Sequence, residues 1–320
     1  MKGNATAPRF DCACIGAVYI RAMRTLMLLL LVTAVTPRVV AARVADDSLR
    51  ARSERRIAEV PGAVVGVAYR DVDDDRGVYV NADTIFHAAS TMKVPVMIEL
   101  FRRADAGALR LDDGILLVNQ FGSIVDRSPF STDPKDDSDS SVYARVGTRV
   151  PLRELMERMI VRSSNLATNA VIALVGADRV TATAHALGAR HMTVLRGVED
   201  NKAFGRGLIN STSARDLAVL LAAIETGRAA SPASCAAMRD ILLRQEFNDE
   251  IPAGLPPGTR VAHKTGSITG VLHDAAIVYP PGRRPYVLVV LTRGIPDEAI
   301  ARTLIADISR MVWESNAGGA

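Results

Sequence analysis

The sequence predicts an α+β fold, in which an antiparallel β-sheet flanked by helices receives an inserted, mainly helical domain. Strand-type apolar runs lie near both ends of the chain, at residues 63–69 and 286–292, whereas helical spacing dominates from about Ser90 to Gly227. Strands at both ends with helices between them indicate that the terminal parts share one sheet. We therefore assign three regions: a leader at 1–42, an α/β part at 43–85 and 230–320, and a helical part at 86–229.

The part that follows the leader begins with a charged helix and a hairpin. Residues 46–59 have an amphipathic helical pattern, which Pro61 and Gly62 end. Residues 63–69 read as a buried strand, and an acidic turn leads to a second strand at 77–80. We expect these two strands to pair.

The later elements follow the same rules of spacing and capping. Apolar periodicity predicts helices at 152–160, 165–175 and 177–187, and Ser213 is expected to cap another. The predicted strands lie at 261–266, 274–279 and 286–292, and a last helix at 297–313. The segment at 126–141 is rich in Asp and Ser, and we interpret it as an exposed, solvated insertion rather than a cation site.

The first 42 residues have the order of a signal peptide. Arg21 and Arg24 precede an apolar run at 26–32, and small residues follow at 40–42. The run is short for a membrane span, so we expect export to the periplasm or medium rather than an uncleaved anchor. The leader holds five of the 39 basic and one of the 35 acidic residues, which leaves 34 of each in the rest of the chain.

This charge balance and the cysteine count exclude several classes of function. A neutral mature chain gives no reason to expect a nucleic-acid partner. Cys12 and Cys14 lie in the leader, so Cys235 stands alone in the mature chain and neither a disulfide nor a cysteine zinc site is expected. The five histidines form no His-x-x-x-His pair and there is no glycine-rich phosphate loop. We expect no metal and no cofactor.

A hydroxyl and an amine stand three residues apart at an expected helix start, Ser90 and Lys93. One helical turn separates them, so the Lys93 amine is expected to reach the Ser90 oxygen and act as its base. The unpaired N–H groups of a helix start would favour an oxyanion there. A serine before an apolar helix is also an ordinary N-cap, so this pair needs further support.

Two later motifs supply that support. Ser163-Ser164-Asn165 falls in the break between two helices, and Lys264-Thr265-Gly266-Ser267 lies along a strand. With Ser90-x-x-Lys93, these motifs resemble the signature of the penicillin-recognising serine hydrolases, and specifically of the class A serine β-lactamases. The resemblance covers roughly residues 46–315 and implies the family's α+β fold, with the site between the two parts.

The resemblance also implies a role for each residue. Ser90 would be the acylated nucleophile, Lys93 its base or proton relay, and Ser163 the donor to the departing lactam nitrogen. Asn165 would hold the substrate's side-chain amide, and Lys264 and Thr265 its carboxylate. The N–H groups of Ser90 and Ser267 would form the oxyanion hole.

A loop acid separates a lactamase from its transpeptidase relatives. Glu199 follows Asn165 by 34 residues, a separation that fits the family's deacylating glutamate, and a purely structural acid is the alternative. Arg196 is expected to pair with Asp200 or another acid. The loop departs from the family's pattern, because one extra residue separates Arg196 from Glu199 and Ala203 stands where an asparagine is usual.

Two further departures concern single residues. Ser164 occupies the middle of the usual Ser-Asp-Asn motif, and His273 stands near the place where many members carry an arginine for the substrate carboxylate. His87 and His263 flank the motifs, and we expect them to serve packing or orientation.

We therefore expect an exported, monomeric serine β-lactamase that acts on a small β-lactam substrate through a Ser90 acyl-enzyme, with Glu199 activating water. The catalytic region would span 43–320, without stable membrane association once the leader is removed. Two alternatives stay open: a DD-peptidase or esterase of the same fold, and a β-lactam-binding sensor that acylates without turnover.

Overall fold

The computed structural model describes residues 1, 3, 37–73 and 76–317. Most of the predicted leader, with Cys12 and Cys14, lies outside these residues. The chain divides into two units, Met1–Ala45 and Asp46–Ala320. In the first unit, the described structure consists mainly of the first part of helix α2 (Pro37–Ala58). No helix in the described part of the chain is long and apolar enough to cross a membrane.

The second unit is built on a five-stranded antiparallel sheet with the order β2-β1-β11-β10-β9. Its strands are β1 (Val64–Asp71), β2 (Gly77–Val80), β9 (Arg260–Ile268), β10 (Val271–Tyr279) and β11 (Tyr286–Arg293). The N-terminal hairpin of β1 and β2 therefore joins the last strands of the chain in one sheet, through the pairing of β1 with β11. The predicted α+β fold class is confirmed.

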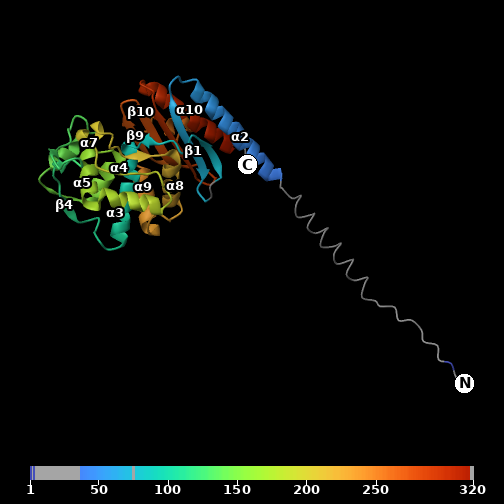
Figure 1. Cartoon of the computed structure of the whole chain (residues 1–320), viewed down its shortest axis with the longest axis horizontal. Coiled ribbons are helices and arrows are strands. Elements are labelled where there is room, and N and C mark those ends of the chain that lie inside the picture. Colours follow the sequence, from blue (N-terminus) through green and yellow to red (C-terminus); the bar gives the residue numbers. More distant parts are fainter. Residues whose placement is uncertain (2, 4–36, 74–75, 318–320) are drawn as a thin grey trace. The chain divides into compact units, whose positions relative to one another are not determined.

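Both faces of the sheet are buried, as strand β11 illustrates. Val287 and Val289 pack into one apolar cluster, which includes residues of helices α3 (Lys93–Asp105) and α8 (Ala214–Glu225). Leu288 and Val290 point the other way, into a cluster with helix α10 (Glu298–Ala317). Side chains alternate between the faces of a strand, so a strand covered on both faces is a continuous apolar run. Figure 1 shows α10 and α8 beside the sheet.

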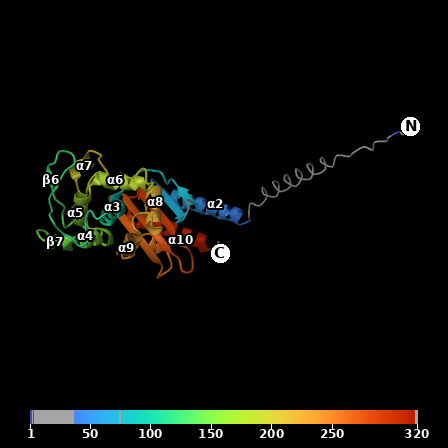
Figure 2. The ribbon, with the colours of Figure 1, turned by 90° about the horizontal axis from the view of Figure 1, so that it is seen from below.

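The remaining helices gather next to the sheet, as Figure 2 shows. They are α4 (Leu152–Val161), α5 (Asn165–Val175), α6 (Ala177–Ala186), α7 (Asn201–Gly205) and α9 (Pro232–Leu242). Helix α3 is buried along Lys93–Phe101 and contacts α4, α5, α6 and α9, so it is the centre of this part. Ser213 caps α8 as predicted, with its side chain accepting from Asp216 N. Helix α8, expected within the helical region, packs on the sheet.

Several short elements were absent from the sequence prediction. Three small ladders pair β3 (Phe86–His87) with β8 (Ser211–Thr212), β4 (Gly114–Leu116) with β7 (Arg149–Pro151), and β5 (Phe121–Gly122) with β6 (Pro129–Phe130). Three 3₁₀ turns are η1 (Ala89–Met92), η2 (Ser140–Arg145) and η3 (Pro252–Gly254). Elements of two to six residues are too short for a period to be read. The β3–β8 ladder and η1 flank the site described next.

The two-faced burial of β11 predicts a large loss of stability for Leu288→Ala. Leu288 is fully buried, so the cavity should lower the free energy of unfolding by about 2–5 kcal/mol. Urea denaturation monitored by circular dichroism measures this loss. Ile300→Ala on α10 is the control, because Ile300 is 45% exposed and its loss should change stability by no more than about 0.5 kcal/mol. Equal effects of the two substitutions would contradict this account of the sheet.

Candidate active site

Ser90 lies in the 3₁₀ turn η1, directly before helix α3 begins at Lys93. Strand β9 packs so closely on this turn that a Cβ atom on Gly266 would lie 2.9 Å from Ser90 N and 3.0 Å from Thr91 N. Only glycine fits this approach without displacement. The glycine of the Lys-Thr-Gly motif therefore lets β9 run beside the backbone of the predicted nucleophile.

The Lys93 side chain is completely buried beneath Ser90's turn. Its Nζ atom donates to Ser163 O at 2.7 Å, to Ser163 Oγ at 3.1 Å and to Asn165 Oδ1 at 3.1 Å. Burial, followed by the charge of Lys264, lowers the pKa of Lys93 well below its usual range. The predicted contact with the Ser90 oxygen is thus replaced by bonds to the Ser163 turn, and the lowered pKa means that Lys93 loses a proton more readily than an exposed lysine.

A second buried amine reaches the same hydroxyl. Lys264 Nζ donates to Ser163 Oγ at 3.0 Å and to Thr265 O at 2.9 Å. Burial lowers the pKa of Lys264 to about 7. Ser163 itself has a φ of 57°, in the left-handed region that non-glycine residues rarely adopt. Two amines from α3 and β9 therefore converge on one strained serine between α4 and α5.

Glu199 joins this hydrogen-bond network through Asn165. Its Oε1 accepts from Asn165 Nδ2 at 2.7 Å, and its Oε2 accepts from Asp133 N at 3.1 Å. Burial raises the pKa of Glu199, although both hydrogen bonds oppose the shift. Asn165 thus links Glu199 to Lys93. Residues from four separate stretches of sequence form one hydrogen-bonded chain.

The loop that carries Glu199 is held differently from the prediction. Arg196 donates from Nε to Leu208 O at 2.9 Å and from Nη1 to Gly197 O at 2.9 Å. Its hydrogen-bond acceptors are therefore backbone carbonyls and not a carboxylate. Asp200 caps helix α7 through Ala203 N and accepts from Ser123 Oγ and Ile124 N. Arg196 and Asp200 therefore form no hydrogen-bonded pair, although each lies within reach of the other's charge. Ala203 is fully buried.

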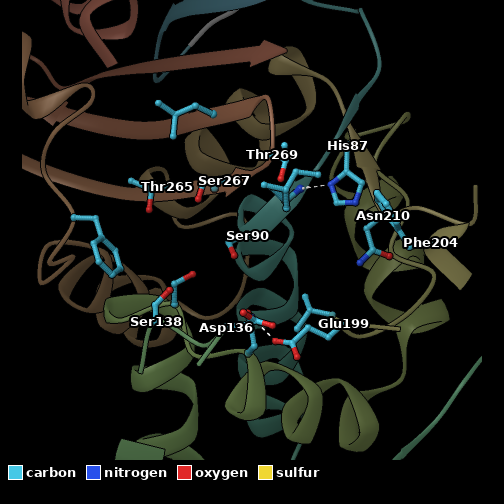
Figure 3. Close-up of a pocket in the computed structure, with 18 of the residues that line it drawn as sticks. His87, Ser90, Asp136, Ser138, Glu199, Phe204, Asn210, Thr265, Ser267 and Thr269 are labelled. Carbon is cyan, nitrogen blue, oxygen red and sulfur yellow. Dashed lines mark hydrogen bonds between the residues drawn. The ribbon is translucent and has the colours of Figure 1, made fainter. Parts of the chain in front are cut away.

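These groups surround a cleft of about 600 Å³, a size suited to a small molecule. Figure 3 shows Ser90 between Thr265 and Ser267 on one side and Asp136 and Glu199 on the other. Six of the eight predicted site residues line the cleft: Ser90, Ser163, Asn165, Glu199, Thr265 and Ser267. The other two, Lys93 and Lys264, are buried behind its wall.

The acidic segment at 126–141 is mostly exposed, as its composition predicts, but two of its aspartates are buried. Asp137 is 8% exposed and Asp139 is 2% exposed, although most of their neighbours in the segment are exposed. Asp139 accepts from Arg158 Nη1 at 3.0 Å, and Asp137 reaches the start of α5. In the described residues, no cluster of three or more metal-ligating side chains is found. Asp136 and Ser138, which sequence reasoning missed, line the cleft.

Further lining residues were missed because their signals are weak. Phe204 of α7 packs edge-on against His87, with ring centroids 5.9 Å apart, and both face the cleft. Asn210 lies beside them in Figure 3. Phe247 lies on a loop after α9 and also lines the cleft. A single aromatic residue in a loop carries no period or spacing, so only the fold identifies these positions.

Two of the histidines, His263 and His273, are buried. His273 is not among the residues that line the cleft. Its Nε2 lies 2.9 Å from His87 O, and its Nδ1 lies 2.8 Å from Leu272 O and 3.1 Å from Thr292 N. His263 contacts Asp274 through Nδ1 at 3.0 Å.

The burial of His273 predicts a pH-dependent loss of stability. Burial lowers its pKa from 6.5 to about 4 in the folded chain. As pH falls below 6.5, His273 binds a proton in the unfolded chain but stays unprotonated in the folded chain. The free energy of unfolding therefore decreases by about 3 kcal/mol by pH 4. His273→Gln, which cannot titrate, should remove this part of the slope. Urea denaturation between pH 7 and pH 4.5 measures the difference, and parallel curves for the two proteins would contradict it.

Comparison with known proteins places this site in a family. The profile of the Beta-lactamase enzyme family matches residues 48–315. A β-lactamase of Streptomyces albus G is 28% identical over 272 residues, covering 82% of this chain and 84% of that protein. β-Lactamase Toho-2 of Escherichia coli is 30% identical over 258 residues, covering 79% and 84%.

Solved structures agree with this assignment. PBP-A matches with a TM-score of 0.73 and 28% identity, covering 85% of this chain and 96% of that one. The TLA-3 extended-spectrum β-lactamase matches with a TM-score of 0.75 at 21% identity, covering 84% and 98%, a likeness of fold alone. Family and fold together support β-lactam hydrolysis or a penicillin-binding activity. This chain belongs to the beta-lactamase enzyme family.

Proposed function

We propose that the chain is a class A serine β-lactamase, which opens the β-lactam amide by acylating Ser90. The observation that carries the proposal is the convergence of Lys93 and Lys264 on Ser163 Oγ, at 3.1 and 3.0 Å, at the wall of the cleft that Ser90 lines. A lysine whose pKa is lowered by burial gives up a proton more readily and can then act as a base, and a serine between two amines can pass a proton. These are the groups that an acyl transfer requires.

In the acylation step, Ser90 Oγ bonds to the lactam carbonyl carbon and its proton passes to the deprotonated Lys93 amine, which would turn from the Ser163 turn toward Ser90 for this transfer. The carbonyl oxygen becomes an oxyanion, which the N–H groups of Ser90 and Ser267 would stabilise. The C–N bond then breaks as the nitrogen takes the Ser163 proton, and Lys93 returns a proton to Ser163 through their hydrogen bond. The product is an ester on Ser90 with the ring open.

In the second step, Glu199 removes a proton from a water molecule, which attacks the ester carbonyl. The Ser90–acyl bond breaks and the proton that Glu199 took from water passes to Ser90 Oγ, which releases the opened product and restores both groups. Glu199 is held for this role by Asn165 Nδ2 and Asp133 N, and its raised pKa makes it a stronger base than an exposed carboxylate. Asn165 also faces the cleft, where its amide would contact the substrate's side chain.

Lys264 and Thr265 would bind the substrate's carboxylate. Thr265 lines the cleft on β9, and the buried Lys264 amine behind it supplies positive charge when protonated. Anionic substrate would itself favour the protonated ammonium, because an opposite charge raises a lysine pKa. Every step uses the chain's own side chains and backbone, and the proposal includes no metal or cofactor.

We also propose that the mature chain is exported, as a monomer in the periplasm or medium. The support is the order of charged, apolar and small residues in the first 42 positions. N-terminal sequencing of the protein recovered from the periplasm or medium of an expressing cell identifies its first residue. That residue shows whether and where the leader was removed.

A penicillin-binding enzyme that acylates with slow hydrolysis is the second candidate. Ala203 is fully buried at the place where an amide would help to seat water, and PBP-A is among the similar structures, a mutant of which was solved as an acyl-enzyme with penicillin G. A chromogenic cephalosporin in large excess separates the candidates. Many turnovers support the lactamase, and one stoichiometric burst with a plateau overturns it in favour of the binding enzyme.

Replacing the nucleophile should abolish covalent chemistry. Ser90→Ala removes the only atom that the mechanism allows to carry the acyl group, so incubation with penicillin should leave the protein's mass unchanged. Intact-protein mass spectrometry with peptide mapping measures the adduct. An adduct on another residue, or retained turnover of the chromogenic substrate, would contradict the assignment of Ser90.

Replacing the loop acid should separate the two steps. Glu199→Gln keeps the shape of the side chain but removes the base, so acylation should proceed and the adduct should persist, with turnover slowed about a hundred-fold or more. Stopped-flow colour release and mass spectrometry measure the burst and the trapped ester. Glu314→Gln, at a half-exposed ion pair with Arg52, is the matched control and should turn over normally. Normal turnover in Glu199→Gln would assign another base.

A further inference from the structure

The start of helix α5 is held by a carboxylate that comes from outside the Ser163-Ser164-Asn165 motif. Asp137 Oδ2 accepts from Asn165 N at 2.9 Å, from Leu166 N at 2.9 Å and from Ser164 Oγ at 3.2 Å. Tyr143 OH adds a fourth contact at 3.1 Å. The first N–H groups of a helix have no partners inside it. Asp137 therefore satisfies two of them.

The motif's own middle residue completes the cap. Ser164 Oγ accepts from Ala167 N at 3.2 Å while it contacts Asp137, and Thr168 N reaches Ser164 O at 3.2 Å. The first four N–H groups of α5 are thus all accounted for, two by Asp137 and two by Ser164. Neither residue caps the helix alone.

The residues fixed by this cap are those that touch the proposed chemistry. Ser163 precedes the cap with a φ of 57°, a conformation that costs of the order of 1–3 kcal/mol and has to be held by its surroundings. Asn165 follows the cap and bonds both Lys93 and Glu199. A shift of α5's first turn would therefore move the proton donor and the link to the loop acid together.

The segment that carries Asp137 is itself firmly placed. Asp139 N donates to Asp137 Oδ1 at 2.9 Å, and the Asp139 carboxylate accepts from Arg158 of α4. Four residues before Asp137, Asp133 N donates to Glu199 Oε2 at 3.1 Å. The same segment thus contacts the Ser163 turn at one point and the loop acid at another.

We propose that Asp137 is a positioning residue of the active site, and that its carboxylate takes the place of the one that Ser164 does not supply in the middle of the motif. The expected effect of Asp137 on the reaction rate rests on the proposed acylation of Ser90. The role of Asp137 in holding the first turn of α5 does not depend on that proposal. Asp137 does not touch substrate in this account, because it acts through the first turn of α5.

The test moves the carboxylate from position 137 to position 164. Asp137→Asn removes the charge that binds the two N–H groups, and the acylation rate of Ser90 by a fluorescent penicillin should fall about ten- to hundred-fold. Ser164→Asp alone places two carboxylates together and should also slow acylation. An aspartate at an N-cap accepts from the second and third N–H groups, so the double variant Asp137→Asn with Ser164→Asp should recover most of the rate.

A second readout needs no substrate. Amide hydrogen exchange at Asn165 and Leu166 should speed up about ten-fold or more in Asp137→Asn, and exchange at Leu166 should slow again in the double variant. Asp112→Asn, at an exposed ion pair with Arg153, is the control for loss of one acid and should change neither readout. Thermal unfolding of each variant identifies any that fail to fold.

The outcomes separate the two proposals. If the parent chain takes up no penicillin, the proposed function fails, and the exchange rates still decide the role of Asp137. Unchanged exchange in Asp137→Asn, or faster exchange with unchanged acylation, overturns the positioning role. Equal loss of rate in the single and double variants also overturns it, because a general loss of packing would not be rescued by moving the carboxylate. Should Asp137→Asn fail to fold, the folded double variant with near-parental acylation supports the role, and one that folds but acylates slowly overturns it.

Discussion

The burial of two lysines against one serine is the constraint on which the site depends. Removing an ammonium group from water is costly unless hydrogen bonds replace the lost hydration. Lys93 finds Ser163 O, Ser163 Oγ and Asn165 Oδ1, and Lys264 finds Ser163 Oγ and Thr265 O. These acceptors come from the α4–α5 junction and from β9, so α3, α5 and β9 have to meet at this point. The close fit of Gly266 against Ser90's turn follows from the same requirement.

The backbone at this meeting point is strained, and the hydrogen bonds explain how it is held. Of the five non-glycine residues with positive φ in the described chain, three lie at the site: Ala89, Ser163 and Glu199. Each has hydrogen-bond partners within the site. Ala89 N donates to His87 Nδ1, Ser163 receives both amines, and Glu199 is bonded through both carboxylate oxygens. Strained residues that persist in this way cluster where a fold keeps reactive groups in one geometry.

The sequence predicted well the elements whose ends are marked by turns or caps, and predicted poorly the contacts between distant segments. Strand β2 and helix α5 match their predicted ranges, because two flanking turns or a cap and a glycine mark their ends. The local motifs also identified side chains that meet in one cleft, since each motif fixes its residues on one turn or strand. Asp137 could not be found this way, because it lies 28 residues before Asn165 in a polar segment without a period. The same limit explains why the burial of Asp137 and Asp139 within an exposed segment was not predicted, and why the backbone acceptors of Arg196 were not.

The contact between Asp137 and α5 shows what the middle position of the motif requires physically. The N–H groups at a helix start need acceptors, and a carboxylate satisfies them better than a hydroxyl because its charge also complements the helix dipole. That carboxylate need not be adjacent in sequence, provided the fold holds it against the first turn. Here the Ser164 hydroxyl caps one N–H group and leaves room for the Asp137 carboxylate to cap two. A serine at this position is therefore no sign of a weakened site when a neighbouring segment supplies the acid.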